Sequence, residues 1–373
     1  MANAAFFRLY PLEERFSPLP MPKQQDLIAK GYLLPSGVVA PRAYAYWYAG
    51  DYDSAAWLYG QLLRNWDDPQ RGSIPIGWAV DSELSLRFPL IFKYLYETRT
   101  VNDFFIAGDS GAGYLNPTEL YSPRFSGLPS AGDAWTRWNY PWYRQFGLTF
   151  TGFLINGVPP ETREAEHPYA GFSYNGVTEQ ADGVHPTVEL RDSTLPVFHE
   201  ANDIVNMNAT VAAATMCHSV DPRATGPQFM MYRTILESAG LMHDIVAALA
   251  TACPIMQIVD PHVAAYLARL HLGGNNDNIA TYLADTIPPV VAAGSNISAL
   301  FTVRNDGWNV LSATTVALNI TIAGPAGTTV RAAHEEFSRV ILSACRTTST
   351  AHLYDIWRPV LHTCLPAHTD CLP

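Results

Sequence analysis

Charged residues are scarce in this chain of 373 residues: they make up 15% of it, against 48% for hydrophobic residues. Such a composition argues against disorder, because a disordered chain carries more charge and less apolar surface. Runs of lysine or arginine are missing too, and the formal net charge is −11. Since no stretch would neutralise a phosphate backbone, we expect no nucleic-acid partner.

Long apolar runs are also missing. No uninterrupted stretch reaches the roughly 18 residues of a membrane helix, so the sequence predicts no membrane span. The N-terminal segment does not show the charged and then apolar layout of a signal peptide. Three N-glycosylation sequons, which begin at Asn208, Asn296 and Asn319, nevertheless point to an extracellular or secretory location.

Cysteine and histidine follow no metal-binding pattern. The five cysteines match no zinc spacing, and no His-x-x-x-His pair occurs. From this we expect neither a metal ion nor another cofactor. Three of the cysteines, Cys345, Cys364 and Cys371, lie near the C-terminus, where an oxidising compartment would permit a disulfide.

Short apolar runs alternate with helical patterns from residue 43 onward. Strands are expected at 43–50, 73–80, 103–108, 148–157 and 255–261, and less regular stretches at 169–176, 183–193 and 228–235 continue the series. Helices are expected at 54–66, 82–99, 131–147, 236–250 and 262–272. This alternation predicts an α/β fold with a parallel sheet, either a barrel or an open doubly wound sheet.

The α/β domain is expected to span residues 1–275 and to resemble a (β/α) barrel. Its first strand begins near residue 43, and too few strand and helix units precede Pro261 to close a barrel comfortably. We therefore expect an incomplete barrel, with earlier units on sequence that this chain does not contain.

The pattern changes after the barrel-like domain. Residues 286–335 alternate apolar and polar side chains, are rich in valine, isoleucine and threonine, and turn at Asn305-Asp306-Gly307. This pattern predicts a small immunoglobulin-like β-sandwich as an accessory module. Residues 336–373 are expected to form a cysteine-containing tail.

Acidic residues follow three of the predicted strands. In barrels and doubly wound sheets alike, ligand chemistry sits where strands end and helices begin. Asp51 and Asp53 lie between the first strand and a helix, and Asp81 and Asp109 follow the next two strands. Paired carboxylates at such a junction can bind a cation or transfer protons, although Asp53 can also simply cap the helix.

The stretch GDSGAGYLNP, residues 108–117, places an acid, three glycines and a tyrosine directly after a strand. It is not a nucleophile elbow, because Ala112 stands where Gly-x-Ser-x-Gly needs its second glycine. It is not a dinucleotide loop, because Asn116 replaces the third glycine of Gly-x-Gly-x-x-Gly. Glycine lets the backbone approach a ligand closely, so we interpret the stretch as a site loop.

The segment GAGYLNP resembles the signature of the GxGYxYP family of putative glycoside hydrolases. The blocks YWYAGDYDSAAWLY, WDDPQRGSIPIGWAVDSEL and TRTVNDFFIAGDSGAGYLNP resemble, in that order, the C-terminal domain of this family. The resemblance covers about residues 1–272. It departs at Asn116, which stands where the family has its second tyrosine. Any role of that tyrosine's hydroxyl in the family is therefore not expected in this chain. The resemblance also implies that an N-terminal part precedes this chain.

What the resemblance implies is a barrel-like domain that acts on carbohydrate. Glycoside hydrolysis needs two carboxyl groups that face one bond. We expect Asp53 and Asp109 to be the acid/base group and its partner, with Asp51 as an orienting or cation-binding group. The residues expected to contact the substrate are Tyr48, Trp78, Asp81, Ser110, Gly111, Gly113, Tyr114, Asn116 and His185.

Two alternatives stay open. A carbohydrate-binding or surface-interaction protein would keep aromatic residues at the rim but cleave nothing. A metal-dependent deacetylase would also use acids and histidines on a barrel rim, although no ligand spacing supports one here. The aromatic content of 12% fits a ligand of flat or ring shape, but most aromatic side chains are expected in the core.

Overall fold

The computed structural model describes residues 8–273 except for residues 13, 122–123, 125, 159, 181–185 and 192–193, and beyond residue 273 it describes only short strands. The chain divides into two compact units, residues 1–276 and 277–373. All helices of the described residues belong to the first unit.

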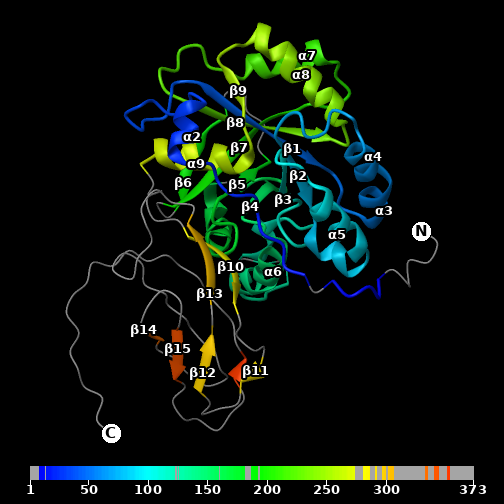
Figure 1. Cartoon of the computed structure of the whole chain (residues 1–373), viewed down its shortest axis with the longest axis vertical. Helices are drawn as coiled ribbons and strands as arrows, with labels where there is room; N and C mark the ends of the chain where they lie inside the picture. Colours follow the sequence, from blue (N-terminus) through cyan, green and yellow to red (C-terminus); the bar gives the residue numbers. More distant parts are fainter. Residues whose placement is uncertain are drawn as a thin grey trace. The chain divides into compact units, whose positions relative to one another are not determined.

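Seven parallel strands of the first unit close into a barrel (Figure 1). In barrel order they are β1 (Ala43–Gly50), β2 (Ile76–Val80), β3 (Asp103–Ala107), β4 (Phe150–Leu154), β5 (Gly176–Glu179), β7 (Leu195–Asp203) and β8 (Gln228–Ile235). β8 pairs with the whole length of β1, and β2 pairs with the end of β1, which closes the ring. The expectation of an incomplete barrel is therefore wrong.

The barrel closes because β5 and β7 supply two strands that the apolar pattern did not reveal. β7 ends in the polar residues HEAND, so it lacks the continuous apolar run by which a buried strand is recognised. Residues 169–176 were expected to continue the strand series, but η5 (His167–Gly171) occupies much of that range and β5 begins only at Gly176. Two short strands flank the barrel: β6 (Val188–Arg191) is antiparallel to β7, and β9 (Met256–Ile258) is parallel to the start of β1.

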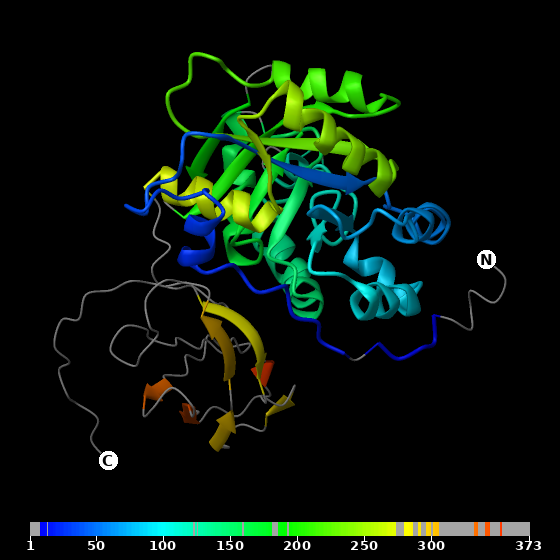
Figure 2. The ribbon, with the colours of Figure 1, turned by 45° about the horizontal axis from the view of Figure 1, so that its top comes forward.

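Helices lie around the barrel, and α7 and α8 lie side by side (Figure 2). The separate α-helices are α2 (Gln24–Ala29), α5 (Pro89–Thr98), α6 (Gly132–Phe146), α7 (Ala209–His218), α8 (Ala239–Ala252) and α9 (Pro261–His271). Short ones are α3 (Ala55–Trp57), η1 (Leu58–Leu62), α4 (Leu63–Trp66), η2 (Ser82–Leu86), η3 (Pro117–Leu120) and η4 (Pro160–Ala165). The π-turn η1 joins α3 to α4 into one helix over 55–66, close to the predicted range. None of the described helices is long and apolar enough to cross a bilayer.

Alternate side chains of β1 face two different layers. Trp47 belongs to the large hydrophobic core that the strands share with the helices. Tyr46 points into the barrel, because its ring contacts Phe150 of β4 and Phe198 of β7, which are not neighbours of β1. Its hydroxyl also forms a hydrogen bond of 2.5 Å with Thr178 of β5. The barrel is thus filled by side chains and is not a pore.

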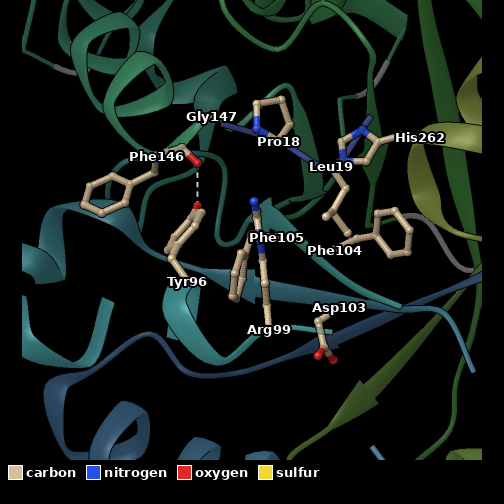
Figure 3. A pocket seen from close by; sticks show the side chains of 10 residues that line it. All are labelled: Pro18, Leu19, Tyr96, Arg99, Asp103, Phe104, Phe105, Phe146, Gly147 and His262. Atoms are coloured by element: carbon tan, nitrogen blue, oxygen red, sulfur yellow. Dashed lines mark hydrogen bonds between the residues drawn. The ribbon is translucent and has the colours of Figure 1, made fainter. Parts of the chain in front are cut away.

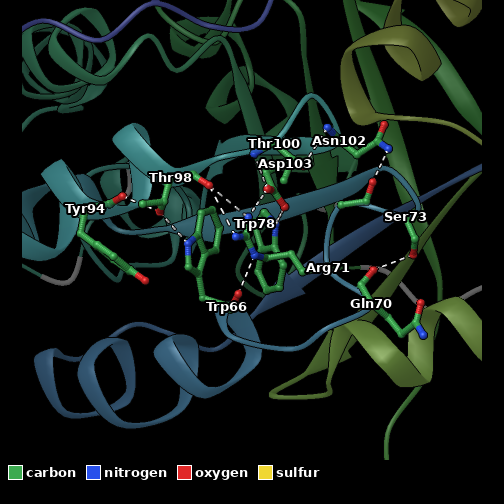
Figure 4. A network of polar contacts seen from close by, with 11 residues as sticks. Trp66, Gln70, Arg71, Ser73, Trp78, Tyr94, Thr98, Thr100, Asn102 and Asp103 are labelled. Carbon is green, nitrogen blue, oxygen red and sulfur yellow. Dashed lines mark hydrogen bonds and ion pairs between the residues drawn. The ribbon is translucent and has the colours of Figure 1, made fainter.

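A buried polar network on the outer side of β2 and β3 fixes part of this core (Figure 4). Asp103 is fully buried, pairs with Arg71 and accepts a hydrogen bond of 2.8 Å from Nε1 of Trp78. The Arg71 guanidinium lies 4.2 Å from the centroid of the Trp66 ring. The Trp66 ring thus covers part of the Arg71 guanidinium, and Asp103 is fully shielded from solvent.

The chain segment before β1 packs against the amino-terminal end of the barrel. Phe16 stacks on Tyr96 with ring centroids 4.2 Å apart, and its amide donates to the carbonyl of Gln145 at 2.7 Å. A small cavity beside Pro18, with room for about one water molecule, lies between this segment and the start of β3 (Figure 3). In barrels this end contributes to stability, whereas active sites lie at the opposite end.

The second unit is described as strands, and all its described pairings are antiparallel. The strands are β10 (Ala280–Asp285), β11 (Val290–Val291), β12 (Asn296–Ala299), β13 (Phe301–Asn305), β14 (Ala332–His334), β15 (Val340–Ser343) and β16 (Ala351–His352). The packing of a sandwich and the tail with Cys345, Cys364 and Cys371 lie outside the described residues, so the domain boundaries within this unit stay predictions.

Candidate active site

All six non-glycine residues with positive φ in the described part of the chain lie just after barrel strands. They are Asp51 (φ 67°) after β1, Asp109 (41°) and Ser110 (75°) after β3, Asn156 (62°) after β4, Asn206 (54°) after β7 and Leu236 (58°) after β8. Left-handed backbone is costly for residues other than glycine and concentrates at functional sites. The carboxyl-terminal rim of the barrel is therefore the candidate active site.

Four aspartates from three neighbouring strands gather at this rim, and we call Asp51, Asp53, Asp81 and Asp109 the acid cluster. Asp51 and Asp53 follow β1, Asp81 follows β2 and Asp109 follows β3. The Asp109 carboxyl interacts electrostatically with the other three. Asp51 and Asp53 are half-buried, whereas Asp109 is 5% and Asp81 only 1% exposed. Among the described residues, no group of acidic, histidine or cysteine side chains is arranged to hold a metal ion.

Burial and mutual repulsion keep protons on the deep members of the acid cluster. Burial, followed by repulsion from Asp53 and Asp51, raises the pKa of Asp109 to about 7. Burial, followed by the charge of Asp109, raises the pKa of Asp81 well above its usual range. Repulsion between neighbouring buried carboxyl groups favours their protonated forms. The rim thus combines two deeply buried acids, whose pKa values are raised, with two half-buried aspartates.

The Tyr48 hydroxyl approaches the acid cluster from inside the barrel. Tyr48 is fully buried, and its hydroxyl has no hydrogen-bond partner among the described residues. A Cβ atom on Gly108 would come within 3.4 Å of this hydroxyl and 3.0 Å of Asp81 Oδ1. Burial, followed by the charges of Asp109 and Asp81, raises the pKa of the Tyr48 phenol. Tyr48 therefore remains a hydrogen-bond donor beside the acids.

Two glycines give the site loop, residues 108–117, its shape. Gly111 has φ 134° and Gly113 has φ 130°, which side chains other than glycine rarely adopt. Helix α6 holds the loop from behind: Asn139 Oδ1 accepts from the Ala112 amide at 2.7 Å, and Trp138 Nε1 donates to the Ala112 carbonyl at 2.6 Å. A Cβ atom on Gly111 would overlap Asn139 Oδ1. The backbone path therefore requires glycine at position 111.

The polar side chains of the site loop differ in their contacts. Ser110 is fully buried, and its hydroxyl accepts a hydrogen bond of 2.9 Å from the Ile155 amide, which ties the loop to β4. Asn116 Oδ1 accepts from the Thr118 amide at 3.0 Å and so caps η3. Tyr114 is 64% exposed and lies within electrostatic reach of the acid cluster. Of these three side chains, Tyr114 is the one placed to meet a ligand.

Replacing Gly111 by alanine is expected to destabilise the protein by roughly 1–3 kcal/mol, because the backbone conformation is strained for alanine and the new methyl group meets Asn139. Urea denaturation followed by circular dichroism measures this loss. Gly127→Ala is the matched control: its φ of 68° is also positive, but no atom lies within 4 Å of the new methyl group. Equal losses of stability in the two variants would contradict the steric requirement for glycine at position 111.

Arg233 of β8 brings a positive charge to the rim, and the sequence analysis missed it. Its guanidinium donates to both carboxylate oxygens of Asp203 on β7, at 2.5 and 2.6 Å, and lies 3.6 Å from Glu200. Burial raises the pKa of Asp51, and the charge of Arg233 opposes that shift. The sequence feature that could have predicted this charge is the single arginine within the apolar run QFMMYRTI.

Trp78 does not lie at the rim, where a contact with the substrate was expected. It is fully buried, and Asp103 holds its indole on the outer side of β2, so the ring has no exposed face for a sugar. Side chains two positions apart in a strand share a face, and Asp81 points inward whereas Trp78 points outward. Tyr48 is also buried and offers its hydroxyl instead of a stacking face. His185 lies outside the described residues.

Comparison with known families assigns this barrel. The family model described as GxGYxYP putative glycoside hydrolase C-terminal domain matches residues 42–269, from the start of β1 to the end of α9. The chain belongs to the GxGYxYP family. The namesake motif of this GxGYxYP domain is the site loop beside the acid cluster, with Asn116 where the motif has its second tyrosine.

A solved structure shares the fold of this GxGYxYP domain. It is described as a putative hydrolase from Bacteroides thetaiotaomicron, with a TM-score of 0.55 and 15% sequence identity. The similarity covers 73% of this chain and 51% of that chain, so the chain spans about half the length of that protein. At this identity the likeness shows the fold alone. No curated protein matches the chain.

Proposed function

We propose that this GxGYxYP domain hydrolyses a glycosidic bond in a poly- or oligosaccharide and that the acid cluster carries out the reaction. The observation that carries the proposal is the buried Asp109, whose pKa is raised to about 7, beside the half-buried carboxylates of Asp53 and Asp51. Membership of a family of putative glycoside hydrolases supports a carbohydrate substrate. The position at the carboxyl-terminal end of a parallel barrel supports a catalytic site.

In this proposal Asp109 is the general acid. Its proton moves to the glycosidic oxygen as the bond between that oxygen and the anomeric carbon breaks. Asp53 acts on the anomeric carbon from the other side, either as the nucleophile or as the base that takes a proton from the attacking water. Asp51, which interacts with both Asp53 and Arg233, orients the second carboxylate. The anomer released, followed by NMR, distinguishes the two routes.

Hydrolysis is expected to slow as the pH rises through about 7. The general acid must hold its proton, and Asp109 loses that proton as the pH passes its raised pKa of about 7. The value of kcat/KM, measured from about pH 4 to about pH 9, should therefore fall on the alkaline side. A profile that stays flat or rises through neutrality would contradict Asp109 as the acid.

A carbohydrate-binding protein without catalysis is the second candidate. The exposed ring of Tyr114 beside the acid cluster favours it, because such a ring binds a sugar whether or not a bond is cleaved. Binding that is equal in the parent and in Asp109→Asn, together with no cleavage by the parent, would identify this function.

A further inference from the structure

Exposed aromatic rings are concentrated at one part of the barrel rim. The exposed aromatic residues of the described chain are Trp57, Tyr59, Tyr94, Tyr114 and Trp138. Tyr94 lies in the middle of α5, between β2 and β3, and the other four lie in the segments that follow β1 or β3. Aromatic side chains are large and apolar, so leaving several of them half-exposed in one region calls for a ligand.

The four rings, which we call the aromatic rim, are tied to the loops around the acid cluster. Trp57 lies in the first turn of the helix that follows Asp53, where the Ser54 hydroxyl accepts from its amide. Tyr59 packs edge-on against Phe88, which follows β2, with ring centroids 5.6 Å apart. The aromatic rim therefore reaches from the segment after β1 to the segment after β2.

The other two rings belong to the segment after β3. Tyr114 is part of the site loop and lies within electrostatic reach of Asp109, Asp53 and Asp51. Trp138 of α6 is half-exposed while its indole nitrogen donates to the Ala112 carbonyl of the same loop. One edge of the indole is thus fixed by the loop, and 48% of the residue remains exposed.

The remaining part of the rim has a different chemistry. The described residues that follow β5, β7 and β8 present no exposed aromatic ring, and the charged groups Arg233, Asp203 and Glu200 lie there instead. Aromatic stacking is therefore available on the side of β1 to β3. A ligand that uses the rings and reaches the acid cluster extends in that direction.

We propose that the aromatic rim binds a glycan of several sugar units, which extends from the acid cluster over the segments after β1, β2 and β3. The proposal rests on the proposed function, because the acid cluster supplies the end of the site where a bond is cleaved. It adds that the natural substrate is a long chain and not a disaccharide. Sugar units beyond the cleaved bond contribute binding through Trp57, Tyr59 and Trp138.

The charges around the rings favour a glycan over a protein partner. The cores of protein interfaces are depleted in aspartate and glutamate, whereas here carboxylates lie next to exposed rings. A sugar fits both groups, because its hydroxyls donate hydrogen bonds to carboxylates and its C–H faces pack on the negative faces of aromatic rings. The same substrate class therefore accounts for the rings and for the acids.

Chain-length dependence tests this proposal. Affinity gel electrophoresis with soluble starch, xylan, laminarin, mannan and chitosan identifies a polysaccharide that retards the parent protein. Affinity and kcat/KM are then measured on the two- to six-unit oligosaccharides of that polymer. We compare the parent with Trp57→Ala and Tyr59→Ala, and with Tyr94→Ala as the matched control, an exposed ring within α5 that is not part of the aromatic rim.

The expected result is a loss of about fivefold or more in affinity for the longest oligosaccharide in the rim variants, a smaller loss for shorter ones, and no loss in Tyr94→Ala. Equal affinity of the rim variants and the parent for the longest chain would overturn the proposal. Cleavage without dependence on chain length would overturn it while supporting hydrolysis. Ring-dependent binding without cleavage would support it and reject hydrolysis, and no retardation together with no cleavage would reject both.

Discussion

Replacing Asp109 by asparagine is expected to lower kcat for glycoside hydrolysis by roughly 10²–10⁴-fold, because an amide of the same shape cannot donate the proton that the leaving oxygen needs. Asp109 is 5% exposed and interacts electrostatically with the other members of the acid cluster, so bulk water has little access to replace its proton transfer. The measurement is kcat on the polysaccharide that the parent cleaves best, at a pH below about 7 where the parent acid is protonated.

The fold of this variant is expected to persist. Because the folded-state pKa of Asp109 is raised, the folded protein holds a proton that the unfolded chain releases, and stability falls as the pH rises toward about 7. Asparagine removes that titration, so Asp109→Asn should be at least as stable as the parent at about pH 8. Asp244→Asn, an exposed acid on α8, is the activity control. Hydrolysis at the parental rate in Asp109→Asn would contradict its role.

Replacing Asp103 by alanine is expected to lower the free energy of unfolding by about 3–5 kcal/mol. The change leaves the partly buried Arg71 guanidinium without its carboxylate, and it also removes the acceptor for Trp78 Nε1 and for the Thr100 amide. Breaking a buried pair from one side costs more than the pair contributes, since the remaining charge stays away from water. Denaturation in urea measures the loss.

Two controls separate this effect from the loss of a surface charge. Asp244→Ala removes an exposed carboxylate and should change the free energy of unfolding by about 0.5 kcal/mol or less. Asp103→Asn keeps an acceptor for Trp78 and should cost less than Asp103→Ala, although it still leaves the Arg71 charge unneutralised. An Asp103→Ala loss as small as that of Asp244→Ala would contradict the structural role of the network.

The elements that the sequence predicted best are those with a uniform local pattern. β1 has the predicted range because every residue from Ala43 to Gly50 is apolar or aromatic and buried. Helix α5 begins at Pro89, inside the predicted range 82–99, because proline is tolerated at the first helical position. β7 was missed because Arg233 and the rim require polar residues at its end, which removes the apolar signal.

The candidate site was predictable only in part, because local sequence shows which residues follow a strand but not which of them are exposed. Asp51, Asp53, Asp81 and Asp109 were identified because each follows a strand, and parallel strands end on one side of a sheet. The ring that meets solvent could not be chosen from the sequence: Trp78 and Tyr114 both lie near strand ends, yet one is buried and the other is exposed. Whether a ring is exposed depends on the face of the strand on which it lies and on the path of the following loop, and both depend on tertiary packing.

The sequence by itself determined the α/β alternation, the acids after three strands and the glycine-rich loop, because these depend on local spacing and on backbone freedom at glycine. Only the tertiary structure decided that the barrel closes, since closure depends on pairing between β1 and β8, far apart in the chain. It also decided which carboxyl groups have a raised pKa, because burial and the distance between charges, not residue type, set the pKa of Asp81 and Asp109.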